Sequence, residues 1–160
     1  MSARVILADS SVARSWPTFA KIASMVQRLR EAGRDLRLVV PAIAHTEIVF
    51  ALRRKKGAGF DAQQVMGPLQ QRGVVIEALD SAAAEKVATV LSLWFPNDDA
   101  WKAAKTNGNL DWHIAAHAES LENATLLVHD KGPEFANVSK PISADALIAQ
   151  LDAEFASLEG

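Results

Sequence analysis

The sequence predicts an α/β fold in which a mainly parallel sheet of four to five strands is flanked by helices on both sides. Short apolar runs typical of buried strands alternate with longer segments that carry apolar residues at helical spacing. The first run, residues 5–8, is apolar throughout, which is typical of a parallel strand buried on both faces. Such alternation is typical of strands joined by crossover helices.

The bounds of the elements follow from apolar spacing and from capping and stop residues. We expect strands at residues 5–8, 36–40, 74–79 and 125–128, and a short strand near Val138. We expect helices at residues 18–32, 42–56, 61–72, 81–93, 110–122 and 143–158. Residues 94–109 are rich in Trp, Asn and Gly and are predicted to form a loop with one short helical piece.

The bulk composition describes an ordinary globular chain. Its 160 residues contain no repeat or linker, so we predict a single domain over residues 1–160. The absence of Cys excludes disulfide and thiol chemistry and, with no signal peptide or transmembrane run in the sequence, leads us to expect a cytoplasmic location. The net charge of −2 argues against a protein that coats nucleic acid by charge alone, but it leaves room for a nucleic-acid enzyme with a local basic patch.

Two acids directly follow predicted strands. Asp9 comes after residues 5–8, and Asp130 comes two residues after the strand predicted at 125–128. Because parallel strands end at the same edge of a sheet, and open α/β folds bind ligands there, these carboxylates are expected to be neighbours.

Two further acids belong to predicted helices. Glu47 lies among apolar residues of the helix over 42–56, and Asp111 opens the helix over 110–122 with its face turned inward. In the helix predicted over 42–56, the stripe expected to face inward consists of Ile43, Glu47, Phe50, Ala51 and Arg54. Four converging carboxylates would repel one another, and a hard divalent cation such as Mg²⁺ or Mn²⁺ would relieve that repulsion. Such a centre polarises a phosphodiester and activates a water.

Four motifs, ILADSSVA, AHTEIVFAL, LDWHIAAHA and LLVHDKGPEF, follow one another between residues 5 and 138. In this order and spacing the sequence resembles the PIN-domain ribonucleases, and among them the VapC-like toxins of bacterial toxin–antitoxin pairs. The resemblance implies a PIN-like domain that cuts single-stranded RNA with Mg²⁺ or Mn²⁺. The implied metal-binding and catalytic residues are Asp9, Glu47, Asp111 and Asp130, with Ser11 at the small polar position beside the first acid.

The resemblance also implies binding partners, and several alternative functions remain. It implies an RNA substrate, a homodimer, no membrane, and a small antitoxin that blocks the cleft with a basic segment. A nuclease of RNA processing and a catalytically silent binding module remain alternatives of the same fold. A haloacid-dehalogenase-like phosphatase would need an acid at Ser11, and a receiver domain would need its phosphoacceptor on a middle strand. Residues 94–108 are longer and richer in Trp and Asp than in a typical short family member. The chain as a whole is also long for a minimal toxin, which leaves room for a different regulator or dimer contact.

Several residues also have simpler interpretations. Asp9 can serve as a helix cap, Glu47 as a boundary residue, and Asp111 as an acid favoured by the helix dipole. The acid pair Asp98 and Asp99 is better explained as an exposed loop pair than as metal ligands.

The basic run, Arg53, Arg54, Lys55 and Lys56, can hold RNA phosphates or simply complement a helix C-terminus, and these weigh about evenly. His113 and His117 have the spacing of a zinc pair but point away from Asp111, so we interpret them as surface or interface residues. The four Trp residues can stack on RNA bases, although core or dimer packing is the better supported interpretation.

Overall fold

The computed structural model describes residues 3–105, 109–129 and 141–159. Its centre is a five-stranded sheet with the order β3-β2-β1-β4-β5, in which each adjacent pair is parallel. The strands are β1 (Arg4–Ala8), β2 (Leu36–Pro41), β3 (Val75–Glu77), β4 (Ala124–Val128) and β5 (Pro141–Ser143). The predicted fold class, α/β with a mainly parallel sheet of four to five strands, is therefore confirmed.

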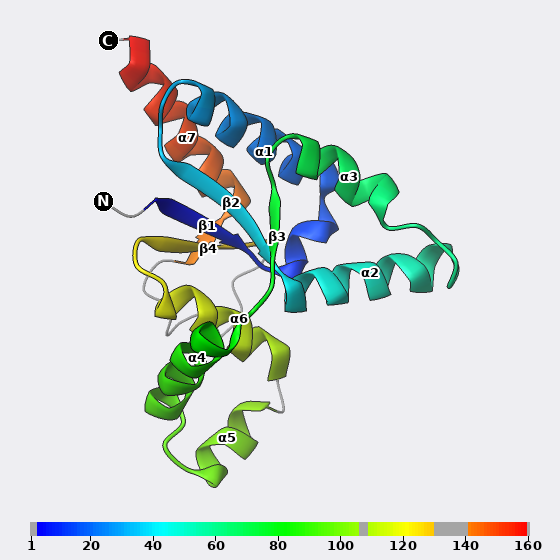
Figure 1. Cartoon of the computed structure of the whole chain (residues 1–160), viewed down its shortest axis with the longest axis vertical. Helices are drawn as coiled ribbons and strands as arrows, with labels where there is room; N and C mark the ends of the chain where they lie inside the picture. The colour runs from blue at the N-terminus through cyan, green and yellow to red at the C-terminus, as the bar shows by residue number, and fades with distance from the viewer. Residues whose placement is uncertain (1–2, 106–108, 130–140, 160) are drawn as a thin grey trace.

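Helices cover both faces of this sheet. Helices α1 and α7 pack together on one side, and α4 and α6 pack together on the other, as Figure 1 shows. The helical elements are a 3₁₀-helix η1 (Ser10–Arg14) and α1 (Trp16–Glu31), α2 (Ala42–Lys56), α3 (Gln63–Gln71), α4 (Ser81–Trp94), α5 (Asp98–Lys105), α6 (Asn109–Ser120) and α7 (Ala144–Glu159). Within the described residues, no helix is long and apolar enough to cross a membrane.

The strand order creates a switch point at the middle of the sheet. The chain runs from β1 outward to β2 and β3, and then returns to the other side of β1 to form β4 and β5. From β1 the chain therefore continues toward one edge of the sheet, and from β4 it continues toward the other edge. Open α/β folds bind ligands at the carboxyl ends of such a pair of strands, and Asp9 directly follows β1 at this point.

The core is built as the sequence predicts. Ile6, Leu7 and Ala8 of β1 have no exposed surface, as expected for a parallel strand covered on both faces. Helices α1 and α7 also contribute to the core. The buried residues of α1 include Phe19, Ile22, Met25, Val26 and Leu29; in α7, Leu147 and Leu151 are buried, and Ala144, Ile148 and Phe155 are partly buried against the core.

The buried stripe of α2 is rotated relative to its prediction. The structure buries Ala44, Ile48 and Leu52, whereas Phe50 is 61% exposed. Helix α2 extends away from the sheet edge (Figure 1), so only a narrow stripe with a four-residue repeat meets the rest of the protein. Glu47 is half-buried at the border of this stripe, next to Ile48.

Two other predictions are refined. The segment 94–109, predicted as a loop with one short helical piece, contains that piece as helix α5, which spans eight residues, Asp98–Lys105. The strand predicted near Val138 falls outside the described residues, and the structure places the fifth strand at Pro141–Ser143.

Candidate functional site

Asp9 directly follows β1 at the switch point and is 3% exposed. Its backbone N–H donates to the Leu127 carbonyl oxygen at 2.9 Å, which holds it against β4. Its carboxylate caps η1, because Oδ2 accepts the N–H of Ser11 at 3.2 Å. The predicted helix cap is thus observed, but it uses only one oxygen. The other oxygen, Oδ1, is buried and has no hydrogen-bond partner among the described residues.

Glu47 lies beside Asp9 although the two are 38 residues apart in the chain. The Ser10 hydroxyl donates to Glu47 Oε2 at 3.2 Å, which connects the start of η1 to α2. Burial raises the pKa of the Glu47 carboxyl, and the negative charge of Asp9 raises it further, while the Ser10 hydrogen bond opposes the shift. Glu47 Oε1 is also buried without a partner in the described part of the chain.

The two carboxylates share one arrangement. Each has one oxygen bonded to the Ser10–Ser11 turn, and each leaves a second buried oxygen without a donor. Burying an anionic oxygen without a partner is costly, and the neighbouring like charge adds to this cost. A hard cation that binds oxygen would satisfy both atoms, so the pair fits one edge of an Mg²⁺ or Mn²⁺ site.

Of the other two predicted acids, Asp111 lies within the described residues and Asp130 does not. Asp111 lies in the first turn of α6 and is half-buried, and α6 packs against α2, the helix of Glu47. Asp130 falls outside the described residues. Among the residues that the structure does describe, no group of three or more His, Cys, Asp or Glu is arranged to hold a metal ion. The four-acid centre therefore stays a prediction, of which Asp9 and Glu47 form the observed pair.

Ser11 connects the site to the end of β4. Its hydroxyl oxygen accepts the backbone N–H of His129 at 2.9 Å, immediately before the position of Asp130 in the sequence. The same residue donates its own backbone N–H to Asp9. Ser11 therefore connects the end of β1 with the end of β4 through these two hydrogen bonds.

The basic run lies at the far end of α2, where Arg53, Arg54, Lys55 and Lys56 are all exposed. The Arg54 guanidinium stacks over the Phe50 ring at 5.0 Å, and Lys56 lies 5.7 Å from the centre of the Phe60 ring. Along the helix axis the run begins about 9 Å beyond Glu47. This geometry is compatible with both predicted roles, and the choice between them stays open.

The prediction that His117 is a surface or interface residue is wrong. His117 is 8% exposed, and burial lowers its pKa, with the charge of Glu77 partly opposing the shift. The helical wheel placed it away from Asp111 but could not show that α4 covers that side of α6. The other histidine of this helix, His113, is half-buried, and its ring centre lies 5.9 Å from that of Trp101.

The tryptophans of the 94–112 region pack on one another. The ring of Trp112 lies 4.9 Å from that of Phe95 and 6.1 Å from that of Trp94, and its Nε1–H donates to the Ala104 carbonyl oxygen at 3.2 Å. Trp112 is 8% exposed. The packing interpretation is therefore confirmed for this cluster, which attaches α5 to α4 and α6.

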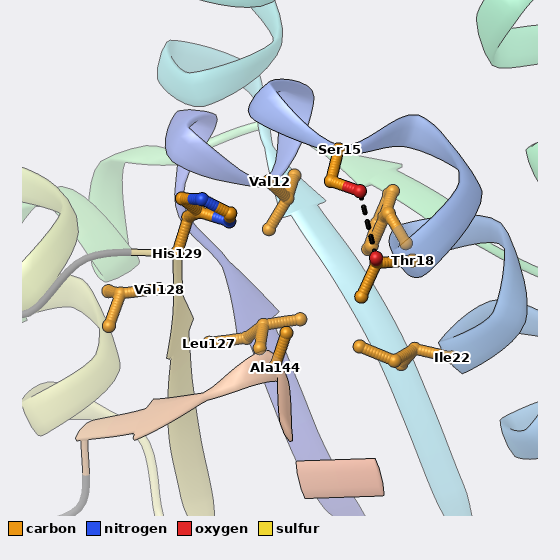
Figure 2. A pocket seen from close by; sticks show the side chains of 9 residues that line it. Val12, Ser15, Thr18, Ile22, Leu127, Val128, His129 and Ala144 are labelled. Carbon is orange, nitrogen blue, oxygen red and sulfur yellow. Dashed lines mark hydrogen bonds between the residues drawn. The ribbon is translucent and has the colours of Figure 1, made fainter. Parts of the chain in front are cut away.

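A small apolar pocket lies between η1, α1 and the end of β4 (Figure 2). His129 stands at one side of it, and the hydroxyls of Ser15 and Thr18 bond to each other at 2.8 Å on another. Its free volume of about 10 Å³ is the space of a single water molecule. A space of this size is too small for a nucleotide, so this pocket is not a candidate substrate site.

Two side chains near the acids were not singled out by sequence reasoning. Nothing in the sequence indicates that the Ser10 hydroxyl reaches a side chain 37 residues further along, on another helix. His45 is half-buried on α2, burial lowers its pKa, and its buried Nδ1 has no partner in the described part of the chain. In the sequence, its position two residues before Glu47 is the only feature that connects His45 with the predicted site.

Comparisons with known proteins find the fold among solved structures. No family model and no curated protein matches the chain. A chain in the crystal structure of VapBC2 from Rickettsia felis bound to a DNA fragment from their promoter is 15% identical, with a TM-score of 0.55 over 87% of this chain and 98% of that one. A chain in the structure of DNA-bound VapBC from Salmonella typhimurium is 12% identical, with a TM-score of 0.57 over 89% and 98%. At this identity the likeness establishes the fold, which is the PIN-like fold that the motifs predicted.

Proposed function

We propose that the protein is an endoribonuclease that cleaves single-stranded RNA with Mg²⁺ or Mn²⁺. The observation that carries the proposal is the pair of carboxylates at the switch point, Asp9 and Glu47, each with one buried oxygen that lacks a donor among the described residues. A buried acid pair is destabilising for the free protein, so its presence at the ligand-binding edge points to a cationic ligand.

Asp9 and Glu47 would hold the ion, with Asp111 and Asp130 as the further ligands that the motif resemblance supplies. When bound, the ion would neutralise the acids, polarise the phosphodiester and lower the pKa of a coordinated water. The protein's own contribution is orientation. The Ser11 N–H fixes Asp9, the Ser11 hydroxyl fixes the strand end before Asp130, and burial keeps bulk water away from the acids.

The substrate would be bound mainly through its backbone. RNA phosphates carry the charge that a divalent ion and exposed cations attract, and the run Arg53–Lys56 is the exposed basic cluster on the helix that carries Glu47. A net charge of −2 makes a local patch necessary for this binding, because the whole chain offers no attraction.

We further infer that this nuclease is the toxin of a toxin–antitoxin pair. The fold likeness to chains of two VapBC complexes supports the inference, as do the four motifs in order. The expected partner is a small antitoxin whose basic segment occupies the acidic crevice, since a cationic side chain would satisfy the same two oxygens as a metal ion. A homodimer belongs to the same inference.

Cleavage of a labelled single-stranded RNA by the purified full chain, freed of any copurifying antitoxin, tests the proposal. We expect cutting that requires Mg²⁺ or Mn²⁺, stops with EDTA, and falls at least about a hundredfold in Asp9→Asn and Asp111→Asn. Asp98→Asn, a change of the same kind at an exposed acid on α5, should cut at the wild-type rate.

Two outcomes would contradict the proposal. Equal cutting by wild type and by Asp9→Asn would show that the activity does not use this site. Absence of cutting by a folded wild-type protein that still binds RNA would instead indicate a catalytically silent PIN-like binding module.

A further inference from the structure

The Ser10 side chain is the direct connection between the first acid's turn and the second acid. Ser10 is the first residue of η1, and its hydroxyl donates to Glu47 Oε2 at 3.2 Å across 37 residues of sequence. It lies within the stretch ILADSSVA but is not among the site residues that the motif resemblance implies, which there are Asp9 and Ser11.

A glutamate on a helix border has considerable freedom that a metal site must remove. Its long side chain loses rotamer entropy when an ion fixes it, and the loss weakens binding. Glu47 is half-buried at the edge of the α2 stripe, and the Ser10 hydroxyl holds one of its oxygens while the second stays without a donor in the described part of the chain. The hydrogen bond thus fixes the carboxylate before any ligand arrives.

The neighbouring residue does the same for the other acid. Ser11 uses its backbone N–H to hold Asp9 Oδ2, and Asp9 Oδ1 stays without a partner among the described residues. Consecutive residues of one turn therefore hold one oxygen of each carboxylate and leave one oxygen of each for a ligand.

We propose that Ser10 is a positioning residue, whose hydroxyl orients the Glu47 carboxylate for the divalent ion of the nuclease site. This role rests on the proposed function. Removing a group that orients a metal ligand typically weakens metal affinity about 10–100-fold, without removing a ligand from the metal. Loss of the Ser10 hydroxyl should therefore weaken ion binding and leave chemistry at saturating ion nearly unchanged.

Calorimetric titration of Mn²⁺ into the full chain measures this directly. We expect the Mn²⁺ dissociation constant of Ser10→Ala to rise about tenfold or more, while Ser10→Thr, which keeps a hydroxyl, stays within about threefold of wild type. The matched control is Ser15→Ala, because the Ser15 hydroxyl bonds to Thr18 and to neither acid. In parallel, RNA cleavage by Ser10→Ala should need about tenfold more Mg²⁺ but reach a similar maximal rate.

Thermal unfolding in EDTA separates positioning from simple structural support. A hydrogen bond that only ties η1 to α2 would lower the melting temperature of Ser10→Ala without changing its Mn²⁺ affinity. If Ser10→Ala is too unstable to titrate, Ser10→Cys keeps the shape of the side chain with a weaker donor, and weaker Mn²⁺ binding is again expected.

Several results would overturn the inference. These are Mn²⁺ binding by Ser10→Ala within twofold of wild type, an equal loss in Ser15→Ala, or an equal loss in Ser10→Thr. If the wild type binds Mn²⁺ and cuts RNA while Ser10→Ala is unchanged, only the role of Ser10 fails. If the wild type neither binds Mn²⁺ nor cuts RNA, the proposed function fails and the inference fails with it.

Discussion

Asp9 shows how one residue can satisfy two interpretations at once. As the cap of η1 it accepts a backbone N–H, which many helix-starting acids do at the surface. A surface cap, however, leaves its second oxygen to water, whereas Asp9 is 3% exposed and its Oδ1 lacks a donor in the described part of the chain. The cap explains the turn, and the second oxygen requires a further explanation, for which we propose a metal ion.

A residue-scale consequence is that the free protein is destabilised by its own site. Burial and the Asp9 charge raise the pKa of Glu47, so its ionised form costs stability as the pH rises through this raised value. In EDTA at neutral pH, Glu47→Gln should therefore melt higher than wild type, by about 2–4 °C for each kcal/mol of relieved repulsion.

The same melting experiment with Mn²⁺ supplies the contrast. Added Mn²⁺ should stabilise the wild type, because a ligand that binds only the folded state raises its stability, and should stabilise Glu47→Gln much less. A lower melting temperature for Glu47→Gln in EDTA would show that the carboxylate is favourably paired, which the account does not allow.

At the scale of elements, aromatic rings contribute to the attachment of α5. Its contacts include the cluster of Trp94, Phe95, Trp101 and Trp112, together with the hydrogen bond from Trp112 to Ala104. Aromatic pairs at these separations add about 0.5–1.5 kcal/mol each beyond the area that they bury.

Trp112→Ala should accordingly destabilise the fold by about 3–5 kcal/mol, the usual cost of truncating a buried Trp. Urea unfolding followed by circular dichroism measures this value. Leu93→Ala is the control, because Leu93 is 77% exposed and its truncation should cost less than about 0.5 kcal/mol. Similar small losses in both variants would mean that the ring cluster does not support the fold.

Helix α6 also carries a buried histidine that makes stability depend on pH. The pKa of His117 is lowered, so the folded state binds fewer protons than the unfolded state, and the stabilising effect of the neutral ring is complete above the ordinary value of 6.5. Stability should fall as the pH drops from about 6.5 through the lowered pKa.

In His117→Gln, the loss of folding stability below about pH 6.5 should be smaller than in the wild type. Midpoints of urea unfolding between pH 5 and 8 would measure this difference. The pKa of His45 is lowered by burial as well, so part of the pH dependence should remain in His117→Gln. An unchanged pH profile in the variant would contradict the assignment to His117.

At the scale of the whole molecule, local sequence patterns predicted most of the architecture. The runs at β1, β2 and β4 and the helices α1, α2, α4 and α7 lie within one or two residues of their expected bounds, because period and caps are local properties. The adjacency of β1 and β4 also followed from parallel topology and is confirmed by their pairing. The full order β3-β2-β1-β4-β5 depends on long-range pairing that no local pattern encodes.

The site was predictable in part for the same reason. Asp9 could be predicted from the end of an apolar strand, whereas Glu47 was placed at the site mainly through the motif resemblance. The helical wheel misplaced the α2 stripe and left His117 at the surface, because a wheel shows which residues share a face but not which neighbours cover it. The contact between Ser10 and Glu47 requires two elements to meet in space, so only the structure could supply it.

The account's central claim is that Asp9 and Glu47 act as one unit in a metal-dependent cut of RNA. The measurement that tests it most directly is the cleavage rate of single-stranded RNA at saturating Mg²⁺ for the wild type, Asp9→Asn, Glu47→Gln and the double variant. Residues that hold one ion lose function together, so the double variant should be no more than about tenfold slower than the slower single variant. Losses that multiply independently, or either single variant cutting at the wild-type rate, would contradict it.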